Sequence, residues 1–236
     1  MGRQSVIVSV LADTKRFRSG LGNAASALGD LGSKLGATAA VVGLAAKKGI
    51  SRALGIEDAT AKLRALGMQG EQIQQTMNDA LASVKGTSFG LDAAATVAGT
   101  AVAAQIKPGK DLQRYLGLVA DTAQVAGTSM EDMGAIFGKV ANNQKVTTEE
   151  MNQLADRGVP IWKYLSESMG VSNDQLRQMV SDGKVSLEDF QTAIEKNISG
   201  AGRIMSDTTS GAFKNMNAAL GRLGAAFAAP ALTHAK

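Results

Sequence analysis

The hydrophobic positions change their spacing near residue 12. Residues 4–11 alternate and are rich in β-branched side chains, so residues 1–12 predict a short strand or an extended arm. From Phe17 to Val42 the apolar positions then step by three and four residues for more than three heptads. This stripe predicts a long helix over residues 13–49, within a basic amphipathic segment that reaches residue 56.

The part of the chain between residues 57 and 198 predicts a compact bundle of short helices. Helical spacing recurs over residues 57–66, 71–84, 91–106, 111–126, 130–142, 148–158, 173–183 and 187–197. Short connections rich in Gly, Pro, Ser and Thr separate several of them. Residues 199–236 hold a linker and the start of a C-terminal helix (211–227). We therefore expect an all-α fold, a bundle of short helices preceded by a long heptad-patterned helix, with a short N-terminal strand in addition.

Composition narrows the chemistry that the chain can perform. The 236 residues include 27 Gly and no Cys, and aromatic residues make up only 4%. Without Cys there is no disulfide, thiolate metal site or Cys nucleophile. The single His, His234, argues against a His-based general base or metal centre. We expect no cofactor, no metal and no small-molecule substrate.

The positive charge of the chain is concentrated at its start. Residues 1–56 hold eight Lys or Arg and two Asp, whereas the remainder is close to neutral. Such an arm is either a solvated helix face or a surface for nucleic acid, an acidic lumen or anionic lipid. The apolar run 35–46 is too short to span a bilayer, which needs about 20 residues, so we expect no stable membrane span.

Three pairs of acidic residues are the candidates for general acid–base catalysis. Each pair follows a hydroxyl residue at capping-box spacing: Ser129 with Glu131 and Asp132, Thr147 with Glu149 and Glu150, and Ser186 with Glu188 and Asp189. A helix-capping role explains every pair without a substrate. We expect Thr147–Glu150 and Ser186–Asp189 to be structural and the chain not to be an enzyme. The segments 145–151 and 184–190 echo one another as two helix-start motifs.

The segment 152–172 contains the only Trp of the chain. Gly158 is expected to end one helix and Pro160 to open the next at its first position. Trp162 then falls on one face with Leu165 and Met169. The favoured interpretation is that Trp162 anchors a helical corner against Leu154, Ile161, Leu176 and Met179; the alternative is that it contacts a ligand.

The stretch TTEEMNQLADRGVPIWKYLSESMGVSNDQLRQMVSDGKVSLEDF (147–190) resembles the N-terminal region of phage tail tape measure proteins, as do residues 205–224 and, less specifically, residues 9–36. The resemblance implies a structural protein of the virion, a long helical chain around which tail tube subunits polymerise, so that chain length sets tail length. It implies assembly in the host cytoplasm, a final place in the tail tube lumen, and tail assembly chaperones, the tail tube protein and baseplate or tip proteins as partners. The basic helix would associate with other copies through Phe17, Leu21, Leu28, Leu31 and Leu35.

The length of the chain departs from that family, whose members run to several hundred residues or more. We expect a fragment, a truncated prophage product or a separately encoded N-terminal piece. Two other functions remain as alternatives. One is a membrane-associating helical module of a prophage-encoded protein, with segment 13–49 lying on a bilayer. The other is a lytic enzyme domain.

Overall fold

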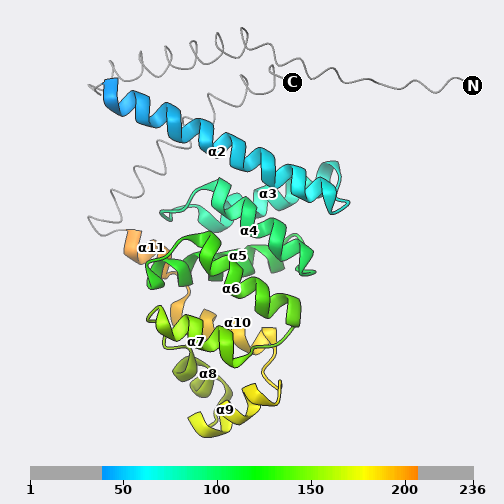
Figure 1. Cartoon of the computed structure of the whole chain (residues 1–236), viewed down its shortest axis with the longest axis vertical. Helices are drawn as coiled ribbons and strands as arrows, with labels where there is room; N and C mark the ends of the chain where they lie inside the picture. Colours follow the sequence, from blue (N-terminus) through cyan, green and yellow to red (C-terminus); the bar gives the residue numbers. More distant parts are fainter. Residues whose placement is uncertain (1–38, 207–236) are drawn as a thin grey trace, which may run out of the picture. The chain divides into compact units, whose positions relative to one another are not determined.

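Every regular element in the described part of the chain is an α-helix. The computed structural model describes residues 39–206 (Figure 1). The helices are α2 (Ala39–Ala65), α3 (Gly70–Val84), α4 (Leu91–Ala103), α5 (Lys110–Ala126), α6 (Met130–Asn143), α7 (Thr148–Asp156), α8 (Ile161–Met169), α9 (Asn173–Ser181), α10 (Leu187–Ile198) and α11 (Ala201–Ser206). The expectation of an all-α bundle is confirmed. The N-terminal strand, the stripe from Phe17 to Leu35 and the helix predicted over 211–227 lie outside the described residues.

Helix α2 is longer than the pattern predicted at its C-terminal side. It continues through residue 56, so the helix expected over 57–66 is the C-terminal part of α2. Gly55 does not interrupt it, although a helical Gly costs about 1 kcal/mol relative to Ala. A Cβ at Gly55 would lie 3.2 Å from the Asp92 Cβ, so the glycine allows α4 to come close. The compact unit that begins at Leu54 and runs to Ala218 contains the remaining described helices.

Helix α4 lies largely inside this unit. Six of its 13 residues are Ala, and seven are buried. It packs against α3, α5 and α6. Gly134 and Gly138 of α6 face it: a Cβ at Gly134 would lie 2.6 Å from Val97 Cγ2, and one at Gly138 would lie 3.1 Å from Thr100 Cγ2. Small residues on both helices therefore bring their backbones close together.

Three aromatic rings join helices that are distant in the sequence. Tyr115 of α5, Phe137 of α6 and Phe190 of α10 are each 0% exposed. The ring centroids of Tyr115 and Phe137 are 5.9 Å apart, those of Phe137 and Phe190 are 5.0 Å apart, and both pairs meet edge to face. Buried aromatic pairs of this geometry stabilise a core beyond the area they bury. Helix α10 is thus fixed against α5 and α6.

Helix α4 ends three residues earlier than its apolar pattern suggested. Gln105 adopts a left-handed φ of +67°, and the Ile106 N–H donates to the Ala101 carbonyl at 3.0 Å. This hydrogen bond closes the helix in the manner usually seen with a C-terminal glycine. Pro108 follows two residues later and prevents further helix.

Candidate functional site

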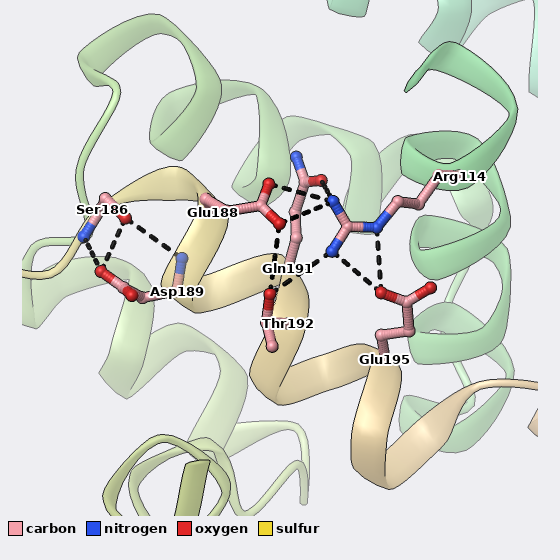
Figure 2. A network of polar contacts seen from close by, with 7 residues as sticks. All are labelled: Arg114, Ser186, Glu188, Asp189, Gln191, Thr192 and Glu195. Atoms are coloured by element: carbon pink, nitrogen blue, oxygen red, sulfur yellow. Dashed lines mark hydrogen bonds and ion pairs between the residues drawn. The ribbon is translucent and has the colours of Figure 1, made fainter. Parts of the chain in front are cut away.

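Arg114 on α5 joins that helix to one face of α10. Its Nη1 donates to both carboxylate oxygens of Glu188 at 3.0 Å, and its Nε donates to Glu195 Oε2 at 2.9 Å (Figure 2). Nη1 also reaches Gln191 Oε1 at 3.2 Å, and Nη2 reaches Thr192 Oγ1 at 3.4 Å. These four partners follow helical spacing, so a single guanidinium spans two turns of α10.

The electrostatics of this contact are those of a partly screened ion pair. The hydrogen bond to Glu188 is the largest cause that raises the pKa of Arg114, and the bond to Glu195 acts in the same direction. The Arg114 side chain is 30% exposed, whereas those of Glu188 and Glu195 are 70% and 46% exposed. Exposed pairs contribute about 0–1 kcal/mol each, so the network mainly fixes the position of α10.

The two echoing segments of the sequence lie side by side at the starts of α7 and α10. Lys145 and Ser186 form an antiparallel bridge. The Val146 N–H donates to the Val185 carbonyl at 2.9 Å, and both valines are fully buried. The similar segments 145–151 and 184–190 therefore pair with one another in the fold. Their similarity alone did not predict this contact.

Both helix starts carry reciprocal capping boxes. At α7 the Thr147 side chain accepts from the helix backbone, while the Thr147 N–H donates to Glu150 Oε2 at 3.0 Å. At α10 the Asp189 N–H donates to Ser186 Oγ at 3.1 Å, and the Ser186 N–H donates to Asp189 Oδ2 at 2.9 Å (Figure 2). Glu150 is 3% exposed, so its carboxylate serves the backbone of its own helix and does not open to solvent.

The three acidic pairs lie at helix starts, and those of α7 and α10 are neighbours. They occupy the first turns of three different helices, α6, α7 and α10. Glu149 pairs with Lys139 at 2.6 Å, and this hydrogen bond lowers the pKa of Glu149. No group of three or more acids, His or Cys is placed to hold a metal ion within residues 39–206.

Gly158 and Pro160 form the corner between α7 and α8. Gly158 has a φ of +78°, and its N–H donates to the Ala155 carbonyl at 2.9 Å. The Val159 N–H donates to the Leu154 carbonyl at 3.0 Å, which completes a Schellman motif. Pro160 occupies the N-cap of α8, one residue before the first helical position expected for it.

Trp162 is only half-buried and lies at the edge of the core. The fully buried residues of α8 are Ile161 and Leu165. Trp162 and Met169 pack against the core from its periphery. The Arg177 guanidinium carbon of α9 lies over the Trp162 ring, 4.5 Å from its centroid. The centre of the corner between α7 and α8 is therefore aliphatic. Ile161 and Leu165 fill it, and the larger Trp162 ring extends from it to the surface.

Two acids, the buried Asp79 and the half-buried Asp121, bind backbone N–H groups at the starts of other helices. Asp79 of α3 is fully buried and accepts from the Gly109 N–H at 2.6 Å, at the N-cap of α5. It also accepts from the Gln75 and Gln113 amides at 2.8 and 2.7 Å. Asp121 of α5 accepts from the backbone N–H groups at the start of α11, at 2.7 and 2.8 Å. One feature of the sequence could have indicated the buried role of Asp79: it lies next to Ala80 on the apolar face of α3.

A groove of about 420 Å³ lies between α3, α5 and the α10–α11 connection. Its floor is one face of α5, where Gly117 leaves space: a Cβ there would meet no atom of the described residues within 4 Å. The charged groups Arg114, Asp121 and Glu195 in it are engaged in the contacts described above. Among the described helices, none is both long enough and apolar enough to cross a membrane.

Comparison with known proteins gives a consistent result. A family model described as "Tape measure protein" matches residues 47–229. A tape measure protein of Lactococcus phage F4-1 is 30% identical over 103 residues, which are 40% of this chain and 28% of that protein. The matched part is thus a minor share of that relative's length. No solved structure matches the chain significantly. Because the family model covers most of its residues, the chain belongs to the tape measure protein family.

Proposed function

We propose that this chain is the N-terminal part of a phage tail tape measure protein. It is a structural and assembly component of the tail tube that sets tail length together with a longer helical rod. The family match over residues 47–229 is the observation that carries this proposal. The bundle supports a structural role, because buried polar side chains such as Asp79 and Glu150 are used to bind helix ends and neighbouring helices.

A non-enzymatic role agrees with the placement of the acidic residues. The family is structural. Of the acids considered as catalytic candidates, Glu150 and Asp189 complete capping boxes, and Glu188 binds Arg114. Each acts within the fold, so none of these carboxylates needs a substrate to account for it.

The partners proposed for the chain are those of tail assembly. They are tail assembly chaperones, the tail tube protein and baseplate or tip proteins, met first in the host cytoplasm and then in the tail tube lumen.

A further partner is a second copy of the chain, through Phe17, Leu21, Leu28, Leu31 and Leu35 of the basic N-terminal segment. Light scattering of the wild type and of Leu28→Asp with Leu35→Asp tests this contact. A wild type that is strictly monomeric would rule it out.

The bundle contributes to assembly and adds little length. As one continuous helix, residues 54–198 would extend about 220 Å, at about 1.5 Å per residue. A compact unit of this size is about 40 Å across. If tail length follows the number of residues, the extended rod must therefore set it, whereas the bundle is a folded domain.

Electron microscopy of tails made by the phage that encodes the chain tests the proposed function. Phe137→Asp places a charge in the centre of the core, where the wild-type residue is 0% exposed. Ala135→Asp places the same charge two residues away, on the exposed side of α6. We expect tails to be absent or irregular in length with Phe137→Asp and normal with Ala135→Asp. Normal tails with an unfolded bundle would contradict the proposal.

A further inference from the structure

The half-buried Trp162 and the exposed Arg177 form a pair whose composition is typical of protein interfaces. Trp162 is the only Trp of the chain, and it is not fully buried although other aromatic rings fill the core. Met169 lies seven residues later on the same face of α8 and is also half-buried. Trp and Arg are the residues most enriched among those that dominate binding energies at interfaces, and Met is enriched in the interfaces themselves.

The hydrogen-bonding capacity of Arg177 is unused within residues 39–206. Its guanidinium carbon lies 4.5 Å from the centroid of the Trp162 ring, and the side chain is exposed. The described helices supply it with neither a hydrogen bond nor an ion pair, although Asp174 precedes it by three residues on α9. Contact with the ring occupies one face of the guanidinium. Its five N–H donors lie in its plane and match a carboxylate, which they can bind through two parallel hydrogen bonds.

The charges on α8 offset one another, so they do not compete with Arg177 for an acidic ligand. On α8, Lys163 pairs with Glu167 at 3.8 Å, so these two charges offset one another. An exposed contact between Arg and Trp contributes only about 0.5–1 kcal/mol to folding. The contact places the guanidinium beside the partly exposed side chains of Trp162 and Met169, and this combination suits a ligand that carries a carboxylate next to an apolar side chain.

We propose that Trp162 and Arg177 form a docking site for an acidic amphipathic segment of a partner protein. Arg177 binds a carboxylate of the partner, and Trp162 with Met169 receives an apolar side chain one helical turn from it. The proposal goes beyond the proposed function, because it requires neither a measuring rod nor control of length. Its failure would leave the role in tail assembly intact, and the reverse also holds.

The fluorescence of Trp162 tests the site directly, because no other Trp contributes to the signal. The full chain is titrated with a synthetic helical peptide built from Ala, Leu and Glu, and then with the same peptide carrying Gln in place of Glu. We expect a saturable change with the Glu peptide and about tenfold weaker binding of the Gln peptide, since a charge-assisted hydrogen bond is lost.

Three variants separate a specific site from general attraction. Arg177→Ala is expected to weaken binding of the Glu peptide about tenfold, and Arg177→Lys nearly as much, because Lys keeps the charge but lacks the planar donors. Lys163→Ala removes the same charge one residue from Trp162 and is expected to have little effect. Circular dichroism checks that each variant keeps the helical fold.

Each of three results would overturn the proposal. The first is a wild type whose fluorescence does not respond to the Glu peptide. The second is equal binding of the Glu and Gln peptides. The third is a loss of affinity in Lys163→Ala as large as that in Arg177→Ala, which would show diffuse attraction to positive charge.

Discussion

Replacing Gly134 with alanine probes how closely α4 and α6 pack. The added Cβ would lie 2.6 Å from Val97 Cγ2 and 2.9 Å from Val97 Cγ1. Both methyl groups are too close, and a Val in a helix has one strongly preferred rotamer, so side-chain rotation does not remove the clash. Overpacking of this kind costs about 1–3 kcal/mol, whereas Ala in place of a helical Gly stabilises by about 1 kcal/mol. We predict that Gly134→Ala lowers the free energy of unfolding by up to about 2 kcal/mol.

Gly117 provides a matched control for this substitution. It also lies inside a helix, α5, but a Cβ there would meet no atom within 4 Å in the part of the chain that the structure describes. Gly117→Ala therefore keeps only the propensity gain, and we expect it to raise the free energy of unfolding by about 1 kcal/mol. Urea unfolding of both variants, followed by circular dichroism and by the fluorescence of Trp162, measures the difference.

If Gly134→Ala stabilises the protein as much as Gly117→Ala does, Gly134 and Val97 are not in close contact. A double-mutant cycle adds a second check. Val97→Ala removes the two methyl groups that clash, so its cost should be smaller in the Gly134→Ala background by at least about 0.5 kcal/mol. Independent effects of the two substitutions would show that these side chains do not meet.

Three further predictions concern polar groups. Tyr115→Phe should stabilise the protein by about 1 kcal/mol in thermal unfolding, because the buried Tyr115 hydroxyl has no hydrogen-bond partner among residues 39–206; a loss of stability would mean that the hydroxyl has a partner elsewhere. Asp79→Asn should cost about 1–3 kcal/mol in urea unfolding, since an amide cannot accept from the Gly109 N–H and from both Gln amides at once; a neutral result would exclude this capping role. Lys139 lowers the pKa of Glu149 below its ordinary 4.5, so the stability that this pair adds is complete above that pH and is lost as the pH falls through the lowered value. The difference in stability between the wild type and Glu149→Gln should therefore vanish in acid; its persistence there would assign the effect to something other than the charge.

Local sequence determines where four of the described helices begin. Ser129, Thr147, Ser172 and Ser186 occupy N-cap positions, and their side chains accept from backbone N–H groups. These features depend on residues within one helical turn, which is why spacing alone could locate them. The left-handed Gly158 is of the same kind.

Contacts between distant residues could not be inferred in the same way. Arg114 meets α10 at a sequence separation of 74 or more positions, and Asp79 meets Gly109 at a separation of 30. The residues around Arg114 do not distinguish it from a solvated Arg, and the position of Asp79 on an apolar face does not identify its partner. Trp162 illustrates the same limit, because helical spacing placed it on an apolar face but did not reveal that Ile161 and Leu165 take the fully buried positions.

A tandem duplication of the gene segment that encodes residues 54–198 tests whether the bundle or the rod sets tail length. The measurement is the length of the tails that the altered phage makes. If these residues fold as a compact bundle and the rod sets the length, electron microscopy should show tails unchanged to within about 40 Å, the width of one such unit. Tails longer by about 220 Å would mean that the same residues are counted as extended helix, which would contradict the account.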